Sequence, residues 1–191
     1  MGEAKASVKL AGRTLLQRCL DALKAAGASS LVVVGRPGGA PALRTAAPDH
    51  GFTVAINPDP GRGMLSSVDA GLRAASAANG TWAWLLPVDC PLVSPAACAL
   101  LSAAVHGTEA AAAVPEHGGR RGHPALLGPE VAWAVREAVE ADAGRTLAQV
   151  LAGFGERVSI VPVDDAAVAD NINRPDDVLR LRARLQEEQG R

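Results

Sequence analysis

The sequence predicts an α/β fold, specifically one three-layer α/β/α domain of Rossmann-like type with a mostly parallel sheet. Strand and helix patterns alternate along the chain, which implies right-handed crossovers between parallel strands. The chain has 191 residues, enough for one substantial core but short for two. It contains no internal repeat and no linker long enough to divide it. We therefore expect a single domain over residues 1–191.

The first half of the chain alternates helix and strand from residue 13 onward. Leucines at helical spacing mark the first helix, which Gly27 ends. A β-branched run at 31–35, bounded by turn residues, predicts a buried strand. A glycine-rich turn at 57–63 precedes a later helix. The predicted elements are, in order, helix 13–26, strand 31–35, helix 43–47, strand 52–56 and helix 66–77.

The second half repeats this alternation. Residues 82–88 are strongly apolar and predict a buried strand. Ser94 and Pro95 follow as an N-cap and a first helical residue. The remaining predicted elements are strands 110–115 and 124–127 around a polar loop, helices 130–141 and 145–153, strand 158–163 and helix 175–186.

No strand pattern precedes the first helix. In a doubly wound fold the first strand leads into a loop and helix N-terminus where a phosphate binds. Here a polar segment containing Gly2 and Lys5 runs directly toward the helix. The sequence thus lacks the element that usually forms one wall of the phosphate site.

Composition excludes several function classes. The formal net charge is −1 with 20% charged residues, so no basic field indicates nucleic-acid binding. Three irregularly spaced cysteines argue against a disulfide framework or a zinc site and favour a reducing compartment. No apolar run approaches the ~20 residues that span a bilayer, and the N-terminus lacks a signal-peptide layout. We expect a soluble, cytoplasmic protein with no membrane partner.

Asp89 follows directly after the apolar run at 82–88. Open α/β sheets bind ligands beyond the carboxyl ends of their strands, so this carboxylate should point into that crevice. Mg²⁺ uses one or two protein carboxylates alongside water and phosphate oxygens. Asp89 is therefore a candidate Mg²⁺ ligand, and a cap of the following turn is the alternative. Cys90 beside it is expected to be a small buried apolar residue.

Near the C-terminus Asn171 and Asn173 alternate around Ile172. An extended backbone would aim both amides to one side and bury the isoleucine on the other. One amide oxygen could then be a second, neutral ligand of the same metal. Ordinary turn and cap chemistry before a helix explains the segment as well.

Two further segments could contact substrate. The loop at 57–67 has two glycines and then Ser66 and Ser67 at a helix start, where free amides favour phosphate or base contacts. A simple loop with an N-cap is the alternative. The segment 117–124 combines glycines, arginines and histidines into a basic lip, and its arginines could clamp an anion. His123 is either a substrate contact or a turn residue. The sequence has no GxSxG, HExxH or Walker motif, so hydrolase triads, zincins and P-loop kinases are not indicated.

Taken in order, these segments resemble the molybdenum cofactor cytidylyltransferase and guanylyltransferase family, the MobA-like nucleotidyltransferases. The resemblance covers essentially the whole chain. The Gly-His-Pro segment is similar to the cytidylyltransferase-type branch. The matching segments are Met-Gly-Glu-Ala-Lys at 1–5, the stretch at 10–16, Asn-Pro at 57–58, Gly-Met-Leu-Ser-Ser at 63–67, Asp89, Gly-His-Pro at 122–124, and Asn-Ile-Asn-Arg-Pro-Asp-Asp at 171–177.

The chain departs from the family pattern at two places. The first strand and most of the glycine-rich signature loop are absent, and that loop contributes amides to the triphosphate site. Asn171 and Asn173 replace carboxylates, so the second metal contact would be neutral. We hypothesise that translation was assigned to an internal Met and that the natural protein extends upstream. Intact-mass measurement of a native protein that begins at Met1 would contradict this.

The resemblance implies a Mg²⁺-dependent nucleotidyltransferase. A phosphate oxygen of an acceptor would attack the α-phosphorus of a nucleoside triphosphate and release pyrophosphate. CTP is favoured and GTP is possible, with a molybdopterin-type acceptor. A sugar or alditol phosphate acceptor is the alternative, and a non-catalytic nucleotide-binding relic is another.

The resemblance also assigns roles to residues. Lys5 and Asp89 would be catalytic, and Asp89 with Asn173 would hold Mg²⁺. The residues expected to bind nucleotide are Gly2, Lys5, Asn57, Gly63, Ser66 and Ser67. Those expected to face the acceptor are Arg120, Arg121, Gly122, His123, Asp142 and Arg145.

Overall fold

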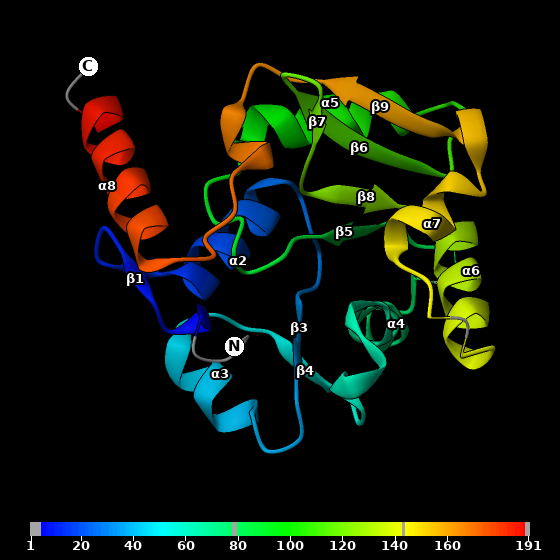
Figure 1. Ribbon diagram of the computed structural model, residues 1–191, viewed down its shortest axis with the longest axis horizontal. Coiled ribbons are helices and arrows are strands. Elements are labelled where there is room, and N and C mark those ends of the chain that lie inside the picture. The colour runs from blue at the N-terminus through cyan, green and yellow to red at the C-terminus, as the bar shows by residue number, and fades with distance from the viewer. Residues whose placement is uncertain (1–4, 78–79, 143, 190–191) are drawn as a thin grey trace.

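The computed structural model describes residues 5–77, 80–142 and 144–189. Figure 1 shows strands at the centre with helices around them. The α-helices are α2 (Leu15–Ala25), α3 (Ala40–Ala46), α4 (Met64–Ala74), α5 (Pro95–Val105), α6 (Pro129–Glu140), α7 (Leu147–Ala152) and α8 (Pro175–Gln189). The strands are β1 (Lys9–Leu10), β2 (Arg13–Thr14), β3 (Val32–Gly35), β4 (Thr53–Ile56), β5 (Ala83–Leu85), β6 (Ala112–His117), β7 (Arg120–Arg121), β8 (Ala125–Leu127) and β9 (Val158–Pro162). Short 3₁₀ helices are η1 (Pro60–Arg62), η3 (Gly155–Arg157) and η4 (Ala166–Ala169).

The larger sheet has five strands in the order β5-β8-β6-β7, with β9 paired to β6. Strand β8 runs antiparallel to both β5 and β6, and β9 runs parallel to β6. Strands β5, β6 and β9 therefore share one direction, which β8 and the short β7 oppose. The predicted α/β class is confirmed, but the pairings within this sheet are mostly antiparallel, because β8 lies between β5 and β6 and β7 forms a hairpin with β6.

Helices cover both faces of this sheet. Residues of β6 alternate between faces, because Ala112 and Val114 pack with α4 and α6, whereas Ala113 packs with Leu101 of α5. Leu126 and Leu127 of β8 divide in the same way. These contacts make the three layers that the alternating pattern predicted.

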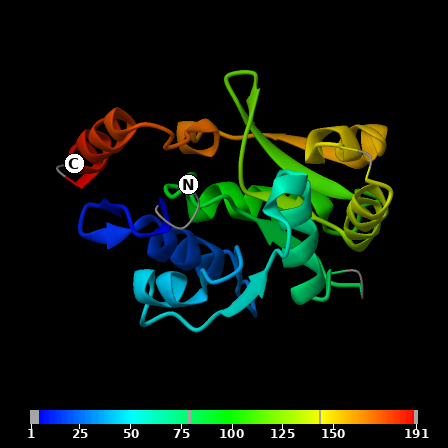
Figure 2. The same ribbon diagram turned by 60° about the horizontal axis from the view of Figure 1, so that its bottom comes forward.

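A second, two-stranded sheet pairs β3 with β4 in parallel. Helices α2 and α3 pack on it through a separate apolar cluster that includes Leu16, Leu20 and Leu43. The core of the described residues is thus divided between the two sheets. The tip of the β6–β7 hairpin stands out from the body (Figure 2).

The structure adds details that the sequence pattern did not predict. A small β1–β2 hairpin precedes α2, and Thr14 caps that helix through a capping box with Gln17. Helix α4 begins at Met64, earlier than predicted, because Gly63 provides the turn (φ 89°) that starts it. Strand β5 is shorter than the apolar run at 82–88. No helix among the described residues is both long and apolar enough to cross a membrane.

Candidate active site

Asp89 lies beyond the carboxyl end of β5, in a turn that the Cys90 N–H closes on the Pro87 carbonyl at 3.0 Å. Its side chain is 24% exposed and lines a cavity of about 1890 Å³. This is the crevice position that an Asp after a buried strand was expected to take.

The loop that precedes α8 contacts Asp89 directly. The Ile172 N–H donates to the Asp89 carbonyl at 2.8 Å, and the Ile172 side chain is buried with Leu10 and Leu15. Asn171 and Asn173, on either side of Ile172, reach the neighbourhood of Asp89. The Asn171 Oδ1 atom accepts from the Cys90 thiol at 3.0 Å. The predicted alternation around a buried isoleucine is confirmed.

Lys5 joins the two segments. Its Nζ lies 3.1 Å from Asp89 Oδ2 and 3.0 Å from Asn173 Oδ1. Only 18% of the lysine side chain is exposed. The two oxygens predicted to bind a metal therefore already converge on one cationic group.

This donor set fits a hard divalent cation that completes its shell with water and phosphate oxygens. One carboxylate and one amide oxygen suit Mg²⁺ or Mn²⁺ better than zinc, which takes three or four nitrogen and sulfur ligands. Among the described residues no group of three or more His, Cys, Asp and Glu side chains could hold a metal. Asp89 and Asn173 would hold the ion.

Most of the described residues that the sequence suggested for the site line this cavity. Its lining includes Lys5, Asn57, Gly63, Ser67, Asp89, Arg120, Arg121, Gly122, His123, Arg145 and Asn171. Gly2 lies outside the described residues. Ser66, Asp142 and Asn173 are not among the residues that line this cavity.

Asn57 organises the loop before α4. Its Nδ2 donates to Ser66 Oγ at 2.8 Å and to Ser67 Oγ at 2.9 Å, and its Oδ1 accepts from the Asp59 N–H. The side chain is buried and both of its N–H hydrogens are used within the loop, so Asn57 positions the two serines.

The two serines then differ. Ser66 is buried and donates its hydroxyl to the Gly63 carbonyl at 2.7 Å, which argues against the expected contact with nucleotide. Ser67 lines the cavity and accepts from Asn57, so its hydroxyl hydrogen can reach a ligand. Helix α4 has no side-chain cap, and its first amides lie at this cavity wall.

The Gly122-His123 segment is fixed against η4. The His123 N–H donates to the Val168 carbonyl at 2.8 Å, and a Cβ on Gly122 would lie 1.9 Å from the same oxygen. Burial lowers the pKa of His123, while the nearby Asp89 charge and a backbone contact at Leu85 act in the opposite direction. A neutral imidazole therefore faces the cavity beside Asp89.

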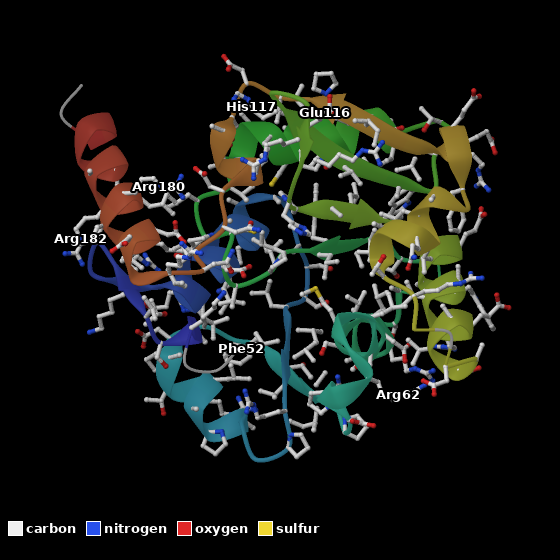
Figure 3. The ribbon with its side chains drawn as sticks, in the orientation of Figure 1. Phe52, Arg62, Glu116, His117, Arg180 and Arg182 are labelled. Carbon is white, nitrogen blue, oxygen red and sulfur yellow. The ribbon has the colours of Figure 1, made fainter. Side chains whose placement is uncertain are left out.

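Arg62 is a residue that the sequence reasoning missed. It lines the cavity and reaches α6, where its guanidinium donates to the Val139 carbonyl and pairs with Asp142 at 3.2 Å (Figure 3). The Asp142 side chain is 83% exposed and pairs with Arg62, and its expected place beside the acceptor stays a prediction. The position of Arg62 between two glycines was the available signal, since such a turn exposes its side chain.

Comparison with known proteins agrees with this architecture. A family model described as MobA-like NTP transferase domain matches residues 1–158. A 96-residue segment is 35% identical to the "Probable molybdenum cofactor guanylyltransferase" of Opitutus terrae, and covers 50% of this chain and 45% of that protein. The match thus spans less than half the length of that relative.

Solved structures share the fold. The 2-C-methyl-D-erythritol 4-phosphate cytidylyltransferase of Thermus thermophilus has a TM-score of 0.71 at 24% identity, covering 96% of this chain and 94% of that one. The Mycobacterium tuberculosis protein Rv0371c in complex with manganese has a TM-score of 0.70 at 23% identity, covering 94% and 91%. At these identities the likeness shows the fold alone.

Proposed function

This chain belongs to the family of MobA-like NTP transferase domains, and from that premise we propose that it transfers a nucleoside monophosphate from a nucleoside triphosphate to a phosphorylated acceptor. The observation that supports this most directly is the convergence of Lys5, Asp89 and Asn173 at the carboxyl end of β5. Charge of both signs meets there inside a large cavity, as phosphoryl chemistry with a metal requires. The proposal treats residues 1–191 as a single domain.

In the proposed reaction an acceptor phosphate oxygen forms a bond to the α-phosphorus, and the bond from that phosphorus to the bridging oxygen of pyrophosphate breaks. A divalent cation, Mg²⁺ in this proposal, would neutralise phosphate charge when Asp89 and Asn173 hold it. The Lys5 ammonium balances the charge on the leaving pyrophosphate. The protein thus contributes position and charge rather than a covalent intermediate.

Nucleotide and acceptor take different walls of the cavity in this proposal. The Ser67 hydroxyl and the open N-terminus of α4 bind the nucleotide. Arg120 and Arg121 on the hairpin, together with Arg145, attract the anionic acceptor. His123, neutral beside Asp89, offers a hydrogen bond without adding charge.

The Gly-His-Pro segment favours CTP and a molybdopterin-type acceptor. GTP is the competing nucleotide, in keeping with the name of the Opitutus terrae relative. The competing acceptor class is a sugar or alditol phosphate, in keeping with the name of the Thermus thermophilus protein. The competing non-enzymatic function is nucleotide binding without transfer.

Calorimetric titration with CTP, GTP and ATP, in Mg²⁺ and in Mn²⁺, tests nucleotide binding. We expect CTP to bind at least tenfold more tightly than the purine nucleotides, and only with a divalent cation. Pyrophosphate release in the presence of molybdopterin, or of 2-C-methyl-D-erythritol 4-phosphate, then assigns the acceptor class. Binding without pyrophosphate release with either acceptor would favour the non-enzymatic function, and the absence of any nucleotide binding would contradict the proposal.

A further inference from the structure

Helix α8 holds both ends of the segment 170–177, which forms one side of the candidate metal site. Asp170 stands at one end of this segment, and Asp177 stands at the other, in the first turn of α8. Both carboxylates contact Arg180 of α8. Its Nη1 lies 3.2 Å from Asp170 Oδ1, and its Nη2 lies 3.4 Å from Asp177 Oδ1. One guanidinium thus joins the two ends of the segment, and we call this three-residue contact the Arg180 clamp.

The other oxygen of Asp177 fixes the backbone at Asn173. Asp177 Oδ2 accepts from the Asn173 N–H at 2.8 Å and from the Arg174 N–H at 2.9 Å. Asp177 is the third residue of α8, a position from which a side chain can reach back to the free N–H groups at a helix start. Hydrogen bonds to an ionised acceptor are stronger than those between neutral groups. The carboxylate therefore sets the course of the chain into α8, and with it the place of the Asn173 side chain.

Between its two ends the segment contacts the rest of the candidate site. The Ile172 N–H donates to the Asp89 carbonyl at 2.8 Å, and Asn173 Oδ1 accepts from Lys5 Nζ at 3.0 Å. The Ile172 side chain is buried in the same apolar cluster as Leu181 of α8. Helix α8 therefore supports the segment twice, through the Arg180 clamp and through this apolar contact.

The exposure of Arg180 argues against a mainly stabilising role. Its side chain is 56% exposed, and ion pairs between exposed groups contribute little to the stability of a fold. Figure 3 shows Arg180 on the side of α8 that faces the segment and Arg182 on the outer side of the helix. Residues two apart on an α-helix lie on nearly opposite faces, which accounts for this difference. The two arginines therefore form a natural pair for comparison.

We propose that Asp177 and Arg180 are positioning residues of the metal site. The Arg180 clamp holds the Asn173 amide oxygen near Asp89 before a divalent cation arrives, so that binding does not have to order the segment. Neither side chain contacts the cation. This role rests on the proposed metal site at Asp89 and Asn173. It adds that α8, which lies beyond the residues 1–158 matched by the family model, controls the affinity of that site for the cation.

Charge alone predicts the opposite effect for Arg180. A guanidinium near the site repels a divalent cation, so removal of the charge by itself would strengthen cation binding. Loss of positioning weakens binding instead, because the segment must then be ordered when the cation binds. The direction of the change in affinity therefore separates the two effects.

The test compares Arg180→Gln with Arg182→Gln in the full chain. The two variants remove the same charge from the same helix, and only the first breaks the Arg180 clamp. Arg180→Lys is a third variant, which keeps the charge but lacks the forked geometry of arginine. Circular dichroism establishes that each variant is folded. Electron paramagnetic resonance measures Mn²⁺ affinity without nucleotide, and NMR measures amide hydrogen exchange at Ile172 in the metal-free protein.

We expect Arg180→Gln to weaken Mn²⁺ binding about tenfold, the lower end of the range for groups that orient metal ligands. The Ile172 N–H should exchange at least fivefold faster, although its acceptor, the Asp89 carbonyl, is unchanged. Arg182→Gln should stay within about twofold of wild type in both measurements, and Arg180→Lys should fall between wild type and Arg180→Gln.

Unchanged or stronger Mn²⁺ binding by Arg180→Gln would overturn the positioning role and leave the proposed metal site intact. Unchanged exchange at Ile172 would also overturn it, because the segment would then be held without the Arg180 clamp. Asp89→Asn tests the metal site itself and should abolish the Mn²⁺ signal. If wild type binds no Mn²⁺, or Asp89→Asn binds it equally well, the metal site and the positioning role are both overturned.

Discussion

The backbone N–H of Ile172 donates a 2.8 Å hydrogen bond to the carbonyl oxygen of Asp89. This bond attaches the loop before α8 to the end of β5, while the buried Ile172 side chain holds the loop against the β1–β2 hairpin and α2. Asn173 is thereby carried to within reach of Lys5. The candidate metal site is assembled by backbone contact between distant segments, so its side chains can be changed without dismantling it.

Replacement of Asp89 by asparagine should therefore strongly reduce catalysis and leave the fold intact. We expect Asp89→Asn to lower turnover at least 100-fold, and the free energy of unfolding to change by less than about 1 kcal/mol because the carboxylate is partly exposed. Pyrophosphate release measures turnover, and urea denaturation measures the free energy of unfolding. Asp49→Asn, an exposed residue outside the cavity lining, is the control and should behave as wild type. Wild-type turnover in Asp89→Asn would contradict a catalytic role for Asp89.

Lys5 should affect metal binding and turnover in opposite directions. Its ammonium occupies the position between Asp89 and Asn173 where a cation would bind, so the two compete in the free protein. We expect Lys5→Met to raise Mn²⁺ affinity several-fold, as measured by electron paramagnetic resonance, and to lower turnover at least 100-fold. A fall in Mn²⁺ affinity would show that Lys5 supports the metal site instead of competing for it.

The extent to which this site could be predicted differs among its residues. The alternation of Asn171 and Asn173 around Ile172 is a local pattern, and the structure follows it. That this loop meets Asp89 depends on chain topology, which spacing alone does not encode. A strand at 124–127 was predicted, but the antiparallel insertion of β8 between β5 and β6 was not, because a three-residue apolar segment has no directional signal.

Ser66 and Ser67 show a further limit of the sequence. Both stand at the predicted helix start, and both seemed equally able to contact nucleotide. Asn57 donates to both, and their difference arises at the Gly63 turn, whose carbonyl accepts from the Ser66 hydroxyl. Adjacent helical residues point about 100° apart, and only the tertiary position of α4 decides which of the two faces the cavity.

The two serines give a matched pair of variants. Ser67→Ala should raise the KM for the nucleoside triphosphate about tenfold, because it removes a hydroxyl at the cavity wall, and should cost less stability than Ser66→Ala, because it breaks one hydrogen bond, the one from Asn57. Ser66→Ala should lower the free energy of unfolding by about 1 kcal/mol or more, since it breaks both the bond to the Gly63 carbonyl and one of the two bonds donated by Asn57 Nδ2. Initial-rate kinetics and urea denaturation separate these effects. A larger KM increase in Ser66→Ala would reverse the assignment.

His123 should make stability depend on pH in the acidic range. Burial lowers its pKa in the folded state below the ordinary value of 6.5. Above pH 6.5 the residue is neutral in both states; as the pH falls below 6.5 the unfolded chain takes up a proton that the folded chain does not. Stability therefore falls through this window, by at most about 1.4 kcal/mol per pH unit, until the folded pKa is reached.

Urea denaturation at pH 5.5 and 7.5 tests this with His123→Gln as the control. The wild-type protein should lose more stability over this interval than the variant, which has no group to titrate there. NMR titration of Asp89→Asn supplies a second check, because removal of the Asp89 charge should lower the His123 pKa further. An identical pH dependence in wild type and His123→Gln would contradict the prediction.

Gly122 should be the least replaceable glycine near the site. A Cβ there would lie 1.9 Å from the Val168 carbonyl oxygen and 2.4 Å from its carbonyl carbon, both backbone atoms that cannot rotate away. Gly122→Ala must therefore displace η4 and break the bond from the His123 N–H to the same oxygen. We expect a loss of about 3 kcal/mol or more in the free energy of unfolding.

Gly51→Ala is the matched control, because a Cβ there meets no atom within 4 Å and its backbone is not in the left-handed region. Its stability should stay within about 0.5 kcal/mol of wild type by urea denaturation. If both variants were equally stable, η4 would have to shift at little cost. The anchoring of His123 beside Asp89 would then depend on contacts other than this close approach.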